Sequence, residues 1–225
     1  MDWPVVWLTV RLAAVTTVLL LLVGTPLAYW LATTRRPWRG AVEALVALPL
    51  VLPPTVLGFY LLLAMGPDGP LGALTEALGL NGLVFTFEGL VIASVLHSLP
   101  FAVQPLAVAF AAVDRSLVET SWSLGRSRTQ TFFRVVVPLS AVGFLTGSVL
   151  SFAHTVGEFG VVLMVGGNIP GATRTLSIAI YDRVQALDYA AAQQMALPLL
   201  VASFLVLAAV YSLRRRWAQP WPIGF

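Results

Sequence analysis

The chain has 225 residues, of which 58% are hydrophobic and 10% are charged, and its mean hydropathy is +0.88. Soluble domains carry about 25% charged residues, so this composition indicates an integral membrane protein rather than a soluble one. The pI near 9.8 can indicate nucleic-acid binding, but the basic residues cluster at the ends of apolar runs. Membrane topology explains them better, and no nucleic-acid partner is expected.

The chain contains neither cysteine nor lysine. Without cysteine it has no disulfide, thiolate metal site or cysteine nucleophile. Without lysine it lacks the usual phosphate-binding loop, so it is not expected to hydrolyse ATP itself. We therefore expect no catalytic residue, no metal site and no cofactor bound by this chain. The N-terminus lacks the features of a cleaved signal peptide, and the first apolar run is expected to remain as a helix.

Five windows of 23 to 25 residues contain no charged residue, and about 20 apolar residues suffice to cross a bilayer core. The expected fold is an all-α integral membrane protein with a single transmembrane domain over 1–225. Its five helices are predicted at about 9–33, 43–65, 89–112, 135–158 and 191–213. Prolines interrupt the second and third windows, and such breaks persist in lipid only where protein or water satisfies the freed backbone groups. Gly143 and Gly147 have the spacing of a small-residue pair that lets helices pack closely.

Ten of the thirteen arginines fall on one side of this five-helix arrangement. They are Arg35, Arg36, Arg39, Arg115, Arg126, Arg128, Arg134, Arg214, Arg215 and Arg216. The positive-inside rule makes that side cytoplasmic, which places the N-terminus outside and the C-terminus inside. Loops 66–88 and 160–190 then lie outside, and the second is expected to contain a short helix around Ile180.

The polar stretch 114–134 between the third and fourth windows is predicted to form two short cytoplasmic helices. Ser116 with Glu119, and Ser127 with Gln130, each fit a capping box. Gly125 lies between them, where a helix end commonly needs a residue with positive φ. Large apolar side chains, which a solvated linker rarely needs, stand on both helices: Leu117, Val118, Trp122, Leu124, Phe132 and Phe133. The alternative is an ordinary cytoplasmic loop whose aromatic residues pack on its own helix ends.

The spacing within this stretch resembles the EAA signature of ABC importer permeases. Glu119 is followed at the family's intervals by Gly125, Val135 and the pair Val137-Pro138. Thr120 and Ser121 stand where the signature has two alanines, and Val137 replaces a leucine. The resemblance implies a coupling helix that inserts into a groove on a cytoplasmic ATPase subunit. It assigns coupling to Glu119, Thr120, Ser121, Trp122, Gly125, Phe133 and Pro138.

From about Thr9 to Leu213 the chain resembles the permease subunit of molybdate ABC transporters. The residues that carry this resemblance are Gly24–Ala28, Leu48–Pro54, Gly157–Gly160, Gly167–Gly171, Arg174–Leu176 and Ala179–Tyr181. The resemblance implies a homodimer in the cytoplasmic membrane, two ATPase subunits that use ATP and Mg, and a periplasmic or lipid-anchored oxyanion-binding protein. Sulfate permeases share much of the pattern, so a sulfate or tungstate permease is the alternative.

Polar residues within the windows are candidates for the pathway or gate: Thr55, His97, Gln104, Ser151, His154 and Thr155. A transported oxyanion needs hydrogen-bond donors but only weak binding. The alternative for each residue is a hydrogen bond to a neighbouring helix. We expect no carboxylate near the two histidines, and we expect Glu158 to bond exposed amides or to pair with an outer arginine.

Arg174 and Arg183, in the second outer loop, are candidates for docking a binding protein. The alternative for both is an ion pair with Asp182 or Asp188. Three other functions compete with the importer: a secondary carrier, an intramembrane enzyme and a membrane anchor for a signalling complex. A carrier usually places ionisable groups at mid-membrane, and an enzyme would need an acid-base set at that depth. The uncharged windows favour neither.

Overall fold

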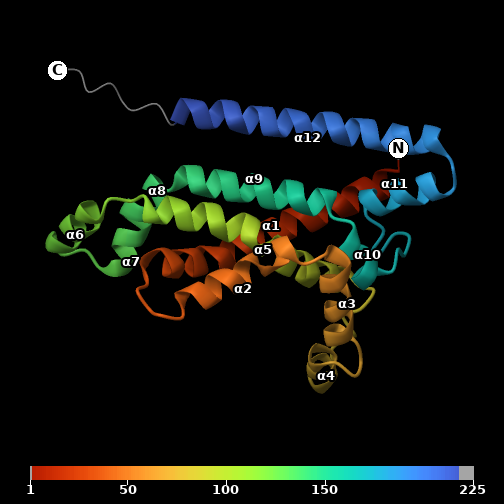
Figure 1. Cartoon of the computed structure of the whole chain (residues 1–225), viewed down its shortest axis with the longest axis horizontal. Helices are drawn as coiled ribbons and strands as arrows, with labels where there is room; N and C mark the ends of the chain where they lie inside the picture. The colour runs from red at the N-terminus through yellow and green to blue at the C-terminus, as the bar shows by residue number, and fades with distance from the viewer. Residues whose placement is uncertain (1, 218–225) are drawn as a thin grey trace.

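The computed structural model describes residues 2–217, and this part of the chain is helical without a strand. The α-helices are α1 (Trp3–Thr33), α2 (Arg39–Val51), α3 (Pro54–Met65), α4 (Pro70–Ala77), α5 (Phe87–Ala111), α6 (Arg115–Ser123), α7 (Arg128–Thr131), α8 (Val137–Leu139), α9 (Ala141–Gly157), α10 (Gly160–Gly166), α11 (Leu176–Gln185) and α12 (Tyr189–Trp217), with a π-helix, η1 (Phe132–Val136), between α7 and α8. The long helices run back and forth between two ends of the molecule (Figure 1). One end holds α6 and α7, and the other holds α10, α11 and the N-terminus (Figure 1).

Four helical segments are long and apolar enough to span a membrane, and a bent pair raises the number to five within the described residues. The four are Trp3–Thr33, Pro54–Ala77, Phe87–Ala111 and Tyr189–Val210. The bent pair joins Arg128–Leu139 to Ala141–Gly157 at an angle of 72°. By length and composition, the chain therefore has the apolar helices of a multi-pass membrane protein.

Two of the predicted spanning helices are broken: the second, where the sequence analysis noted proline breaks, and the fourth, where it expected none. The window at 43–65 is divided into α2 and α3, because Pro53 has no N–H and Pro54 holds the residue before it in an extended conformation. The window at 135–158 is divided at Ser140, where the chain turns from α8 into α9. The predicted outer loop at 160–190 also contains an unexpected element, α10, whose Val161, Val162 and Val165 are fully buried.

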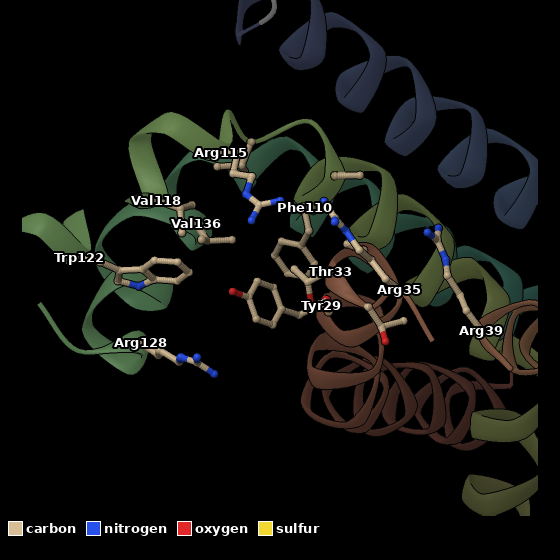
Figure 2. Close-up of a pocket in the computed structure, with 14 residues that line it drawn as sticks. Tyr29, Thr33, Arg35, Arg39, Phe110, Arg115, Val118, Trp122, Arg128 and Val136 are labelled. Carbon is tan, nitrogen blue, oxygen red and sulfur yellow. Dashed lines mark hydrogen bonds between the residues drawn. The ribbon is translucent and has the colours of Figure 1, made fainter. Parts of the chain in front are cut away.

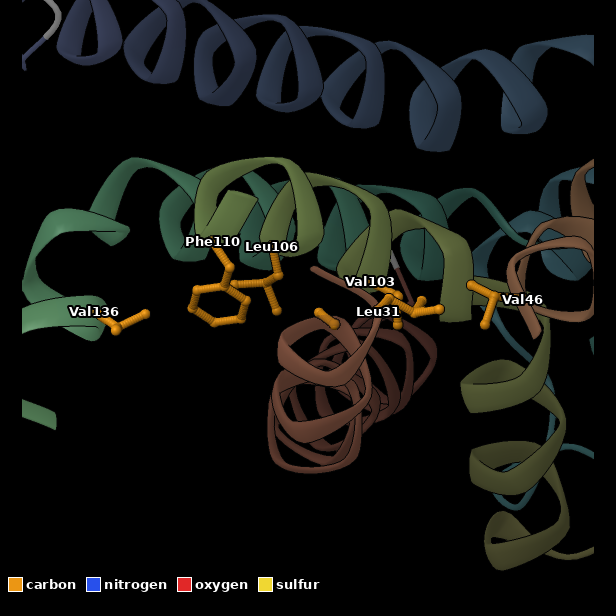
Figure 3. Close-up of a cluster of buried hydrophobic side chains, with 7 residues drawn as sticks. Leu31, Val46, Val103, Leu106, Phe110 and Val136 are labelled. Carbon is orange, nitrogen blue, oxygen red and sulfur yellow. The ribbon is translucent and has the colours of Figure 1, made fainter. Parts of the chain in front are cut away.

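The centre of the bundle is built from α1, α5 and α9, which make the most extensive contacts. Gly147 on α9 lies so close to α5 that an added Cβ would be 3.3 Å from the Ala102 carbonyl oxygen. Gly143, one turn earlier, is even more tightly crowded, against the Ala109 side chain. The predicted role of this glycine pair in close packing is therefore confirmed. An apolar cluster that includes Leu31, Leu106, Phe110 and Val136 fixes the end of the bundle beside α6 and α7 (Figure 3).

Helix α12 lies along one side of the bundle and packs mainly on α11 and α9 (Figure 1). Large apolar side chains along it face away from the rest of the chain, and Phe204 is 69% exposed. Leu197, Leu200, Val201 and Leu205 are also exposed. This surface suits lipid or another membrane helix.

Candidate functional site

The segment at one end of the bundle begins with α6, which is capped differently from the prediction. The Asp114 side chain accepts a hydrogen bond of 2.8 Å from the Ser116 N–H. That N–H lowers the pKa of the Asp114 carboxyl below its ordinary value, so the cap is charged at neutral pH. The capping box predicted for Ser116 and Glu119 is wrong, because Asp114 takes the capping position and Glu119 instead pairs with Arg115 at 2.8 Å.

Gly125 ends α6 in the conformation that the sequence predicted, with φ of +79°. Its N–H donates to the Trp122 carbonyl at 2.9 Å, and the Arg126 N–H donates to the Ser121 carbonyl at 3.2 Å. This pair of bonds is the Schellman motif, which closes a helix through a residue of positive φ. No neighbouring atom lies within 4 Å of a Cβ added at Gly125. The backbone conformation, rather than a lack of space, therefore requires glycine at this position.

Helices α6 and α7 form one connected unit. The predicted capping box of Ser127 and Gln130 is present, with bonds of 3.1 and 3.2 Å. The two helices are also joined by a hydrogen bond of 2.9 Å between the buried hydroxyls of Ser121 and Thr131. Ser121 thus has a structural role in holding α6 against α7. The sequence analysis missed Thr131, whose only signal was a small polar residue on the second short helix.

Phe132 connects this unit to the bundle. Its ring centroid lies 4.9 Å from that of Tyr29 on α1 and 6.0 Å from that of Phe110 on α5. Beyond it, η1 leads into α8, where Pro138 precedes the bend at Ser140. Movement of α6 and α7 would therefore act on both α1 and α9.

The remaining predicted coupling residues lie on the surface. Trp122 is 43% exposed and Phe133 is 63% exposed, while Thr120 and Glu119 are also exposed. Leu117 and Leu124 add further exposed apolar area on α6 and its end. Exposed aromatic and aliphatic groups on a rigid, hydrogen-bonded unit are typical of a surface that contacts another protein.

A cluster of polar side chains is buried between α5 and α9, and the place of Glu158 within it differs from the expectation. The Glu158 side chain is fully buried, and its Oε1 lies 3.2 Å from Nδ1 of His97. Its Oε2 has no hydrogen-bond partner among the residues that the structure describes. The histidines therefore do have a carboxylate beside them, and Glu158 pairs with neither Arg174 nor Arg183. The sequence analysis placed Glu158 at the outer end of the fourth helix with exposed amides or an outer arginine as partners, whereas the short helix α10 that follows it turns back against α3 and α5.

His154 belongs to a chain of hydroxyl groups next to this pair. Ser98 Oγ lies 2.8 Å from His154 Nδ1 and 3.2 Å from Thr155 Oγ1, and Thr155 donates to the Ser151 carbonyl at 2.9 Å. All three contacts are satisfied if His154 Nδ1–H donates to Ser98 and Ser98 donates to Thr155. This assignment follows from the hydrogen bonds, and it leaves Nε2 of His154 without a proton when the ring is neutral. The Phe101 ring stacks on His154 with centroids 4.0 Å apart.

A cavity of about 570 Å³ lies beside these histidines. Its lining includes Thr55, His97, His154 and Glu158, which come from α3, α5, α9 and the end of α9. The structure thus brings together several of the predicted pathway residues. Ser151 and Thr155 are buried and do not line this cavity, and the Ser151 hydroxyl has no hydrogen-bond partner within residues 2–217. Gln104 lies elsewhere, at a cavity of about 410 Å³ nearer α2.

The alignment of the two windows could have indicated this juxtaposition. Helices α5 and α9 are antiparallel neighbours. If the two uncharged windows are placed antiparallel so that Val113, the last residue of one, lies beside Val135, the first residue of the other, His97 and Ser151 come to the same depth in the bundle. Ser151 is less than one helical turn from His154. The position of Glu158 could not be obtained in this way, because it depends on the turn between α9 and α10.

The outer arginines are paired with acidic groups. Arg174 donates to Asn168 Oδ1 at 2.7 Å and lies 3.7 Å from Asp182, whose carboxylate also accepts from Asn168. Arg183 lies 3.6 Å from Asp188. The alternative expected from the sequence, an ion pair for each arginine, is therefore present. Both side chains remain partly exposed, so docking of another protein here stays a prediction.

The fold is that of a multi-pass membrane protein. It has a hydrogen-bonded helical unit, α6–α7, at one end and a polar cavity beside His97 and His154 within the bundle. A family model described as binding-protein-dependent transport system inner membrane component matches residues 24–219. Because this match covers most of the chain, the protein belongs to that family and is a membrane component of a transport system.

Individual relatives narrow the comparison. The molybdenum transport system permease protein ModB of Azotobacter vinelandii is 59% identical over 214 residues, which cover 95% of each chain. A probable sulfate transport system permease protein of Chlorella vulgaris is 35% identical over 180 residues, covering 79% of this chain and 67% of the relative. A solved bacterial ABC transporter involved in import of the acidic polysaccharide alginate has a TM-score of 0.77 at 16% identity, with 96% of this chain and 79% of that chain covered. The chain thus has the fold of an ABC importer permease.

Proposed function

We propose that the chain is the permease subunit of an ATP-driven importer for molybdate or a related tetrahedral oxyanion. Two copies form the pathway, two cytoplasmic ATPase subunits bind at the end that holds α6 and α7, and an oxyanion-binding protein delivers substrate at the other end. The observation that carries the proposal is the α6–α7 unit, which is closed by Gly125 and joined by Ser121 and Thr131, and which presents apolar side chains at the basic end of the bundle.

Coupling follows from how this unit is attached. Nucleotide-driven closure of the ATPase dimer moves α6 and α7 together, since the hydrogen bond between Ser121 and Thr131 keeps them from sliding apart. Phe132 passes the movement to Tyr29 and Phe110 through ring contacts. The bend at Ser140 passes it to α9, which carries His154. The movement of α6 and α7 is thereby transmitted to the cavity beside His97 and His154.

The cavity beside the histidines suits brief contact with an oxyanion. Thr55 offers a hydroxyl that can donate a hydrogen bond, and the rings of His97 and His154 add polar edges to the cavity wall. Glu158 alone would repel an anion, but its side chain is fully buried and its Oε1 lies against His97 Nδ1. Few donors and the absence of a fixed cation among the lining residues favour weak binding, which release requires.

Molybdate is favoured over sulfate because the relative with 59% identity is a molybdenum permease, whereas the sulfate relative is 35% identical. The test is ATPase stimulation of the complete complex in liposomes, with binding protein supplied together with molybdate, tungstate or sulfate. We expect molybdate to stimulate hydrolysis most strongly. Stimulation by sulfate alone would assign the chain to the alternative substrate, and failure to co-purify with any ATPase subunit would reject the importer.

A further inference from the structure

A basic cavity lies inside the end of the bundle where α1, α5, α6 and α7 meet. Its volume is about 800 Å³, and four arginines line it: Arg35, Arg39, Arg115 and Arg128. Figure 2 shows Arg115, Arg128 and the Tyr29 hydroxyl directed toward the same space. No carboxylate belongs to the lining. Four guanidinium groups around one space form a site of strongly positive potential, which favours a phosphate or another oxyanion.

The charges of these arginines are only partly balanced by acidic side chains. Arg39 pairs with Glu43 and Arg115 pairs with Glu119, each at 2.8 Å and on an exposed helix surface. Within the described residues, Arg35 and Arg128 have no carboxylate within ion-pair distance. Exposed pairs of this kind are weak and are easily exchanged for a stronger anionic partner. The cavity can therefore accept negative charge.

An apolar groove of about 650 Å³ adjoins the cavity, and the two share Tyr29 and Arg128 as lining residues. Its other walls include Leu22, Pro26 and Phe144. On α1 the groove extends from Leu21 to Tyr29, a distance of about 12 Å along a helix axis. The arginines begin after the end of α1, whereas the groove lies within the apolar part of the same helix. The groove therefore lies toward the membrane interior, and the cavity lies toward the membrane surface.

We propose that the cavity and groove together bind one anionic phospholipid, with its phosphate among the arginines and an acyl chain along α1. Basic pockets between helices at the cytoplasmic side are a recognised site for anionic lipid head groups. A free oxyanion would use the arginines but leaves the groove without an occupant. A second copy of the chain would cover the groove, yet its own α6 and α7 end is equally basic. Charge complementarity therefore favours the lipid.

The bound lipid would lie between α1 and the α7–η1 segment, beside the ring contact of Phe132 with Tyr29. It would contact both the unit that we propose moves and the helix that receives the movement. This inference stands apart from the proposed function, because lipid retention requires neither ATP nor a partner protein.

The experiment is native mass spectrometry of the full chain in detergent, titrated with phosphatidylglycerol or with phosphatidylcholine of the same acyl composition. We expect selective retention of phosphatidylglycerol. The double variant Arg35→Gln, Arg128→Gln should lose about fivefold in affinity per arginine, since each basic residue near a lipid surface contributes about 1 kcal/mol. The matched control is Arg126→Gln, Arg134→Gln, which removes two arginines of the segment 114–134 that do not line the cavity, and it should retain phosphatidylglycerol.

A second pair of variants tests the acyl chain while keeping every arginine. Thr25→Trp fills the groove and should abolish the preference for phosphatidylglycerol, whereas Val23→Trp places the same ring on an exposed face of α1 and should not. Displacement of the bound species by inorganic phosphate, with Thr25→Trp having no effect, would identify a free-anion site and overturn the proposal. Equal losses in both arginine variants, or no retention by the wild-type chain, would also overturn it.

Discussion

At the scale of single residues, the contact of His97 with Glu158 joins two residues 61 positions apart and holds the Glu158 carboxylate inside the bundle. Its burial is costly, because Oε2 has no hydrogen-bond partner in the described part of the chain. Removing one partner of such a buried pair destabilises the fold strongly, whereas replacing both partners with apolar residues does not.

The first prediction concerns this pair of His97 and Glu158. His97→Leu should destabilise the chain by about 3–5 kcal/mol, because it leaves a buried carboxylate without a partner. Glu158→Gln should cost only about 1 kcal/mol, since the neutral amide can still bond the ring. The measurement is unfolding of the detergent-solubilised chain. The double variant His97→Leu, Glu158→Leu should regain stability over His97→Leu alone, and a further loss would contradict the paired assignment.

At the scale of helices, hydrophobic length predicted spanning segments near 9–33, 89–112 and 191–213, but it placed the second at 43–65, whereas the long apolar segment of the structure is Pro54–Ala77. Length carries no information about direction, so the 72° bend at Ser140 and the inward turn of α10 were missed. The break between α2 and α3 was foreshadowed by Pro53 and Pro54, whose effect on the backbone is local. The candidate site shows the same difference between local and distant contacts. The α6–α7 unit was predicted as two helices around a glycine, but the hydrogen bond between Ser121 and Thr131 that joins the two helices was not predicted.

The second prediction concerns the junction of α6 and α7. Gly125→Val should abolish substrate-stimulated ATPase activity of the complex, because a left-handed conformation costs a residue with a side chain about 1–2 kcal/mol, and a β-branched one more. Gly125→Asn is the matched control, since asparagine tolerates positive φ, and it should retain most of the stimulation. Both variants should remain membrane-inserted, as space is available for either side chain. Normal coupling in Gly125→Val would show that the angle between the helices is unimportant.

At the scale of the whole molecule, the path of the chain brings its arginine-rich segments together at one end of the bundle. The connection after α1 and the α6–α7 unit lie at one end of the bundle, and both carry arginines (Figure 1). The opposite end holds α10 and α11, where Arg174 and Arg183 are balanced by acidic partners. By the positive-inside rule, we expect the end with the larger excess of arginine to face the cytoplasm.

The third prediction tests this orientation, which the coupling proposal requires. Because the chain has no native cysteine, a single Ser123→Cys variant places a unique thiol on the exposed end of α6, beside Trp122. A membrane-impermeant maleimide should label it in inverted vesicles but not in intact cells or spheroplasts. Leu187→Cys, on an exposed turn after α11, is the matched control and should show the opposite pattern. Labelling of Ser123→Cys from outside would place the α6–α7 unit beyond the reach of a cytoplasmic ATPase, and the proposed route from hydrolysis to the polar cavity would then have no starting point.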